Sequence, residues 1–111
     1  MNQRLRFASS AVLLAAAALT IPALLHAQGD ADKTFKTNCV LCHAADGSGN
    51  TSSGKAFKVP DLRSADVQKM SDSQISDVIT QGKNKMPAFG KKLKPDNIKQ
   101  LVAFIRTLPT K

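Results

Sequence analysis

The chain has 111 residues, of which 16 are Lys or Arg and eight are Asp or Glu, so its net charge is +8. This length excludes a multidomain protein and a large enzyme with a deep core. From residue 28 onward, Leu, Ile, Val and Phe make up only 18 of 84 residues, which is close to the level of disordered chains. If this part of the chain folds, we expect something other than side chains to fill its centre.

The first 27 residues are predicted to be a cleavable secretory signal peptide, and residues 28–111 to be a single domain. Arg4 and Arg6 precede an uncharged run over residues 7–27 that ends in a small residue, a pattern typical of exported proteins. Cleavage would leave the domain in the bacterial periplasm with no stable membrane insertion. The alternative is an anchor, because an uncharged run of this length could span a bilayer.

The exported domain is not expected to bind nucleic acid. It would keep 14 basic and eight acidic residues, but no aromatic residues are interleaved with the bases, and export removes the protein from the nucleoid. Export also places its thiols in an oxidising compartment.

A short first helix is predicted from Asp30 to about Asn38. Asp30 is a suitable N-cap residue, and Ala31 and Phe35 fall on one side of the helix. This segment leads directly into the two cysteines of the chain.

Both cysteines lie in the motif Cys39-Val40-Leu41-Cys42-His43. C-x-x-C-H is the attachment pattern of c-type haem. On a helical turn, thiols at this spacing reach both vinyl groups of one porphyrin, and the next residue brings an imidazole under the iron. We therefore predict one haem c, attached covalently through Cys39 and Cys42 with His43 as an axial ligand.

Other interpretations of the two cysteines are weaker. A disulfide between them would close a very small loop and constrain little of the unfolded chain. A zinc site lacks ligands, because no third Cys exists and His43 is the only His left after residue 27. A thiol–disulfide oxidoreductase would place the motif in a strand–helix–strand pattern, and no convincing strand is visible. A chance occurrence of the motif is the remaining alternative.

The next elements are a loop and a middle helix. Residues 46–54 are all Gly, Ser, Thr, Asn or Asp, which predicts a loop. Ser71 and Gln74 form a capping box that predicts a helix ending at Gly82, with Ile75, Val78 and Ile79 as its buried stripe. Met70 would then pack on Ile75 as a hydrophobic staple.

Elimination points to Met86 as the second axial ligand. One chain with one remaining His cannot supply two histidines, and Met70 already has a structural explanation. Met86 lies in a loop bounded by Gly82 and Gly90 and is followed by Pro87, which stiffens the chain. A thioether presented from a stiff loop suits an axial ligand. A lysine ligand, Lys83 or Lys85, is the residual alternative.

The last helix is predicted to begin at Pro95 and to end before Pro109. Asp96 lies near the positive end of its dipole. Apolar residues at helical spacing form its stripe, namely Ile98, Leu101, Val102, Ile105 and Leu108, and Phe104 widens it.

Taken together, residues 28–111 resemble the class I cytochromes c, the small single-haem electron carriers of bacterial periplasms and photosynthetic lumens. The attachment motif and the sequence Met86-Pro87-Ala88-Phe89 carry this resemblance, and Phe35 and Phe104 resemble the aromatic pair that joins the family's first and last helices. The resemblance implies an all-α cytochrome c fold, with three to five short helices wrapped around one covalently bound haem.

The resemblance also implies roles for residues around the haem. Pro60-Asp61-Leu62 is similar to the family's Pro-x-Leu segment, in which the proline carbonyl accepts a hydrogen bond from the axial His and the leucine packs on the haem. The chain has no Tyr or Trp to bind the haem propionates. Lys55, Lys58 and Arg63 are the candidates for that role.

A haem with both axial positions occupied predicts outer-sphere transfer of one electron rather than catalysis. Near Met86, five lysines occur with no acid among them, and they predict docking to redox partners with acidic surfaces; these are Lys83, Lys85, Lys91, Lys92 and Lys94. The alternative is a merely solvated face. Such partners include a membrane oxidoreductase, a terminal oxidase or a photosynthetic complex, and we expect a monomer.

Two other functions stay open from the sequence. The first is a haem enzyme or sensor that reduces peroxide or binds gases after displacement of Met86. The second is an electron-transfer subunit of a membrane oxidase or dehydrogenase complex.

Overall fold

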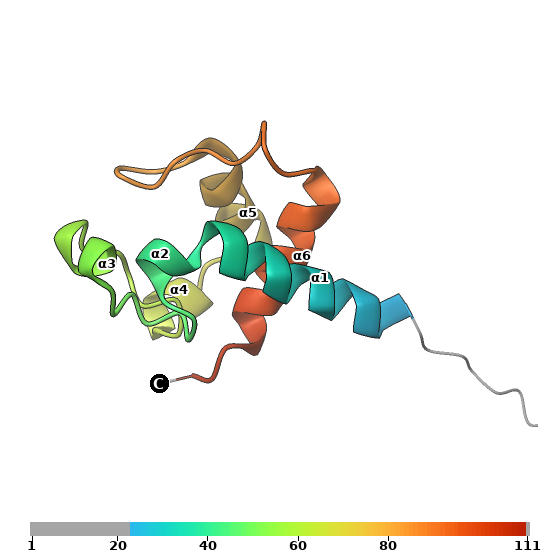
Figure 1. Cartoon of the computed structure of the whole chain (residues 1–111), viewed down its shortest axis with the longest axis horizontal. Coiled ribbons are helices and arrows are strands. Elements are labelled where there is room, and N and C mark those ends of the chain that lie inside the picture. The colour runs from blue at the N-terminus through green and yellow to red at the C-terminus, as the bar shows by residue number, and fades with distance from the viewer. Residues whose placement is uncertain (1–22, 111) are drawn as a thin grey trace, which may run out of the picture.

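The computed structural model describes residues 23–110, and these residues form six helices and no strand (Figure 1). The bounds are α1 Ala23–Asn38, α2 Val40–His43, α3 Ser52–Ala56, α4 Ala65–Gln68, α5 Asp72–Gln81 and α6 Pro95–Thr107. The all-α prediction is confirmed. The three longer helices are those predicted from periodicity, and α2, α3 and α4 are additional helices of four or five residues.

The first helix begins earlier than predicted. It starts at Ala23 and runs through Asp30, so Asp30 lies inside the helix and is not its cap. The prediction overvalued a single cap residue, because residues 23–28 contain helix-forming Ala, Leu and Gln that extend the helix upstream. Most of the predicted signal peptide, residues 1–22, lies outside the described residues. No helix within 23–110 is long and apolar enough to cross a membrane.

The first and last helices pack against each other (Figure 1). Their contact includes the predicted aromatic pair, because the ring centroids of Phe35 and Phe104 lie 5.0 Å apart at an interplanar angle of 44°. Phe35 and Leu101 are the largest fully buried side chains. Ile98, Val102 and Ile105 complete the buried stripe of α6, which also contacts α5.

The predicted ends of the longer helices are largely confirmed. The Ser71 hydroxyl accepts from the backbone N–H of Gln74 (3.1 Å), and the Gln74 amide oxygen accepts from the backbone N–H of Ser71 (2.8 Å), so the capping box forms. Gly82 ends α5 with a φ of 75°, and Pro95 begins α6. The predicted loop over 46–54 is shorter than expected, because the hydroxyl of Thr51 caps α3 from Ser52 onward.

Arg106 forms hydrogen bonds that link the end of α6 to the segment between α4 and α5. Its guanidinium donates to the backbone carbonyls of Gln68 (2.8 Å) and Met70 and to the carboxylate of Asp72 (2.9 and 3.0 Å). The side-chain amide of Gln68 in turn donates to the carbonyls of Leu62 (2.8 Å) and Ile105 (3.3 Å). These bonds tie the chain from Leu62 to Asp72 against the last helix.

Replacing Arg106 with alanine should lower the free energy of unfolding by about 2 kcal/mol, because hydrogen bonds that involve a charged group contribute about 1.5–3 kcal/mol. Lys99→Ala is a matched control, since it removes a cation from the same helix without breaking a hydrogen bond that the structure shows. We expect a change of about 0.5 kcal/mol or less for this control. Chemical denaturation of both variants measures the difference, and equal losses would contradict a stabilising role for Arg106.

Candidate functional site

The two cysteines and His43 follow α1 without a break. The backbone N–H of Cys39 donates to the carbonyl of Phe35 (2.8 Å) and that of His43 to the carbonyl of Cys39 (2.9 Å), so the motif continues in helical geometry through α2. Both thiols are unpaired and half-buried. The helical turn therefore presents the two cysteines and the histidine at one site, as the motif predicts.

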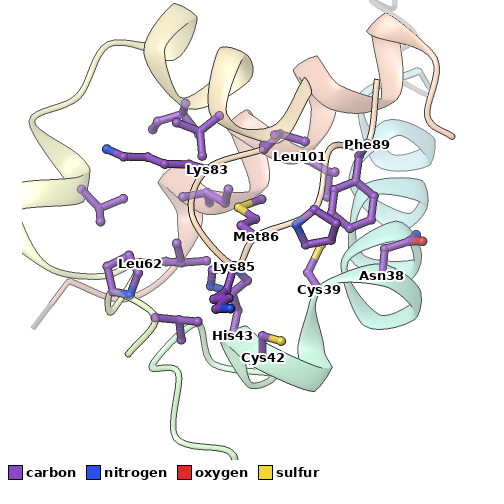
Figure 2. A pocket seen from close by; sticks show the side chains of 18 of the residues that line it. Asn38, Cys39, Cys42, His43, Leu62, Lys83, Lys85, Met86, Phe89 and Leu101 are labelled. Carbon is purple, nitrogen blue, oxygen red and sulfur yellow. The ribbon is translucent and has the colours of Figure 1, made fainter. Parts of the chain in front are cut away.

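These three residues line a large apolar cavity in the centre of the molecule (Figure 2). The cavity has a volume of about 410 Å³. The apolar part of its lining comes from segments spread along the whole domain, and it includes Phe35, Leu62, Val67, Ile75, Val78, Ile79, Leu101 and Ile105. A cavity of this size explains the low content of large apolar residues, because the side chains surround a central space instead of filling it.

His43 has the properties of a neutral iron ligand. It is buried, and burial lowers the pKa of its imidazole, so the ring is uncharged at neutral pH. Its Nδ1 atom is shielded from solvent and has no hydrogen-bond partner. Neutral imidazole is the form that binds metals, and a ligating histidine normally donates from its other ring nitrogen.

Pro60 and Leu62 line the same cavity as His43. Leu62 is buried, and its backbone N–H donates to the carbonyl of Gly47 (2.8 Å), which holds this segment in place. Because Nδ1 of His43 has no partner here, the bond from His43 to the carbonyl of Pro60 stays a prediction.

Met86 reaches the cavity from a tight hairpin (Figure 2). The backbone N–H of Met86 donates to the carbonyl of Lys83 (2.9 Å), and the N–H of Lys83 donates to the carbonyl of Met86 (3.1 Å). The loop then returns to α5, where the N–H groups of Phe89 and Gly90 donate to carbonyls of the last helical turn (2.9 and 3.1 Å). Met86 is therefore held by backbone bonds before and after it.

Gly82 is required at the start of this loop. Its φ of 75° and ψ of 167° belong to a region that is almost restricted to glycine. A Cβ atom at this position would lie 2.7 Å from the carbonyl oxygen of Met86 and 2.9 Å from the nitrogen of Ala88. Any side chain would therefore move the hairpin that carries Met86.

Gly82→Ala should lower the free energy of unfolding by about 1–3 kcal/mol, the usual cost of such a backbone conformation. Gly29→Ala is the matched control, because Gly29 lies inside α1 and a Cβ atom added there would meet no heavy atom within 4 Å. This control should change the free energy of unfolding by about 0.5 kcal/mol or less, because the predicted cleavage near Gln28 leaves Gly29 at the free end of α1. Denaturation curves give both values, and a Gly82→Ala variant as stable as the parent would refute the requirement.

The structure adds a second methionine to the cavity lining. Met70 contributes to the wall as well as to the core cluster that includes Ile75. Elimination from the sequence treated Met70 as a structural residue only, and its place at the cavity was missed because it depends on how α4 and α5 pack. Both methionines of the described chain thus border the site.

The cavity has cations and exposed apolar side chains among its lining residues. Lys58, Lys83 and Lys85 belong to the lining, as do Leu41 and Phe57, which are 76% and 49% exposed. Of the propionate candidates predicted from the sequence, only Lys58 lines the cavity.

The other two candidates lie outside the lining, and Arg63 has other partners. Its guanidinium is bound to the carboxylate of Asp61 (2.9 and 3.0 Å) and lies 3.7 Å from that of Asp46. Arg63 is one of the three candidates that the sequence offers, but Asp61 and Asp46, which lie close to it in the fold, engage its charge. Lys55 is absent from the cavity lining altogether.

The Cys39 thiol lacks the electrostatics of a reactive thiol. Burial, with a smaller contribution from Cys42, raises the pKa of the Cys39 thiol to about 11. Reactive thiols in disulfide exchange have a depressed pKa instead. Within the described part of the chain, no group of three or more His, Cys, Asp or Glu residues could hold a metal ion. A thiol oxidoreductase and a zinc site therefore gain no support.

The chain resembles known proteins over most of its length. Residues 27–105 match a family described as cytochrome C oxidase, cbb3-type, subunit III. The chain is 37% identical to cytochrome c6 of Nostoc sp. over 103 residues, which cover 86% of this chain and 87% of that protein.

Other relatives extend this similarity. The chain is 35% identical over 91 residues to the cbb3-type cytochrome c oxidase subunit FixP of Rhizobium meliloti, covering 78% of this chain and 29% of that subunit. A solved structure described as the KustC0563 c-type cytochrome aligns with a TM-score of 0.68 and 32% identity, covering 74% of this chain and 99% of that one.

Proposed function

Because this chain belongs to the class I cytochrome c family, we propose that it is a periplasmic one-electron carrier that holds one covalent haem c with His43 and Met86 as axial ligands. The observation that carries the proposal is the central cavity, which brings Cys39, Cys42, His43 and Met86 to one apolar site. The burial of His43 among the residues that line this cavity supports it.

Each of the four residues has a defined task. Cys39 and Cys42 would hold the haem through thioethers, with each thiol adding across one vinyl group, and His43 and Met86 would supply a nitrogen and a sulfur to the iron. When bound, the haem supplies an iron that cycles between its ferric and ferrous states and so carries one electron. The apolar lining excludes water and disfavours the extra positive charge of the ferric state, which together with a methionine ligand raises the reduction potential.

With both axial ligands supplied by the chain, no coordination position is left for a substrate. Met86 is held by backbone bonds on both sides of the hairpin, so the ligand set stays the same in both oxidation states. This favours electron transfer over peroxide reduction or gas binding, both of which need an open position at the iron.

The lysines near the Met86 loop suit docking of the protein to a redox partner. Lys83 and Lys85 lie at the cavity, and Lys91, Lys92 and Lys94 follow in the sequence. We call these five residues the lysine patch. The exposed Leu41 and Phe57 line the same cavity as Lys83 and Lys85. Positive charge next to exposed apolar side chains suits a redox partner with an acidic surface, and it increases the rate of encounter.

Electron transfer to an acidic partner should slow as ionic strength rises, because salt screens the attraction between exposed charges. A Lys85→Gln/Lys91→Gln variant should be slower at low salt and less sensitive to salt, whereas Lys99→Gln, outside the patch, should behave like the parent. Stopped-flow rates over a salt series test this prediction. A rate that stays flat or rises with salt would exclude steering by the patch.

The first test of the proposed function is an absorption spectrum of protein exported from a host that has haem-attachment machinery. Sharp low-spin bands in the reduced form and a weak red methionine–ferric band in the oxidised form are expected. A high-spin haem, or one without the red band, would remove Met86 from the site and favour an enzyme or a sensor. Protein without haem would overturn the proposal.

A second candidate, an electron-transfer subunit of a membrane oxidase complex, is supported by the match to the cbb3-type subunit III family and to FixP. The two candidates differ in the fate of the first 27 residues. An intact mass that retains them would favour a membrane-anchored subunit. A mature protein that begins near Gln28 would favour the free periplasmic carrier.

A further inference from the structure

The cysteines and Lys83 lie on different sides of the cavity. The two cysteines lie together on one side, while the side chain of Lys83 extends on the opposite side (Figure 2). Lys58 also belongs to the lining, but its segment lies on the cysteine side, because the N–H of Val59 donates to the carbonyl of Gly54 (2.9 Å) and Gly54 packs against the carbonyl of Cys42.

The structure of the porphyrin determines which of its groups would face Lys83. Its vinyl groups and its two propionates lie on opposite halves of the ring. Thioethers to Cys39 and Cys42 therefore direct both carboxylates away from the cysteines, toward the side where Lys83 lies. Carboxylates near an apolar site require cationic or hydrogen-bonding partners, and the chain has neither Tyr nor Trp to donate to them.

We infer that Lys83 binds a propionate of the haem, an inference that rests on the proposed attachment to Cys39 and Cys42. Lys83 then has a task beyond docking, and the lysine patch in contact with a partner is reduced by one cation. Lys83 also lies in the same hairpin as Met86, because the backbones of these two residues are joined by hydrogen bonds. One short segment thus serves both the iron and a carboxylate.

The test is spectroelectrochemical titration of the haem-loaded protein at pH 7, with Lys83→Gln, Lys58→Gln, Lys83→Arg and Lys99→Gln. Loss of a cation exposes the negative charge of a propionate, which stabilises ferric iron. Lys83→Gln should lower the equilibrium constant for reduction about threefold, the effect expected of a partly exposed ion pair, and Lys58→Gln, on the cysteine side of the cavity, should change it less. A threefold change corresponds to about 30 mV, at about 59 mV per tenfold change.

The controls separate this inference from the function on which it depends. Lys83→Arg keeps a cation and should retain the potential of the parent. Lys99 lies on α6 in a different groove, and Lys99→Gln should leave the potential unchanged despite the same loss of charge. Equal shifts for Lys83→Gln and Lys99→Gln, in variants that keep covalent haem and the red band, would overturn this inference alone. A parent protein without covalent haem would overturn both proposals.

Discussion

Replacing Met86 with alanine should abolish the red methionine–ferric band and lower the reduction potential by several tenths of a volt, since axial ligands set haem potentials over a range of about 0.8 V. The variant should also bind cyanide rapidly in the ferric state, because one axial position is then open. The haem should stay attached, since Cys39 and Cys42 are unchanged. Visible spectra, potentiometry and cyanide mixing measure these three effects.

Met70→Leu is the matched control, because Met70 also lines the cavity and is the other methionine of the described chain. Its substitution conserves volume and should cost less than about 1.5 kcal/mol of stability, with the red band retained. The reverse result, a lost band in Met70→Leu and an intact one in Met86→Ala, would exchange the roles of the two methionines. Retention of the band in both variants would mean that either methionine can bind the iron, whereas a parent protein without the band would indicate another ligand, such as Lys83 or Lys85.

Much of the site was predictable because its chemistry is local in the sequence. Cys39, Cys42 and His43 lie within five residues, and one helical turn suffices to bring them together. The capping box of Ser71 and Gln74 was predictable for the same reason, since each partner lies within one turn of the other. Short-range patterns of this kind specify their own geometry before any tertiary packing occurs.

The features that could not be predicted from the sequence depend on contacts between distant segments. The guanidinium of Arg106 donates hydrogen bonds to backbone carbonyls 36 and 38 residues away. No periodicity in the sequence predicts such a pairing. Met70 and Lys83 line the cavity only because α5 and the following loop close over it, whereas Arg63 is turned toward Asp61 and Asp46. Charge and residue type identified candidates for these roles, but only the fold could choose among them.

The fold surrounds a central cavity that the proposed haem would fill. We therefore predict that the double variant Cys39→Ser/Cys42→Ser, exported without haem, does not fold stably. An unfilled apolar cavity carries a free-energy cost that grows with its volume, and this one measures about 410 Å³. Folded domains have a total stability of only about 5–15 kcal/mol. Far-UV circular dichroism should therefore show much less helix than the haem-loaded parent, with no cooperative thermal transition.

Leu41→Ser supplies the control for this prediction, because it places a serine in the same motif but at a side chain that is 76% exposed. It keeps both thiols and should retain haem, helix content and a cooperative transition. If the double cysteine variant lacked haem and still gave a helical spectrum with cooperative unfolding, the apolar side chains alone would suffice for the core. The low count of Leu, Ile, Val and Phe would then no longer indicate a cofactor at the centre of the fold.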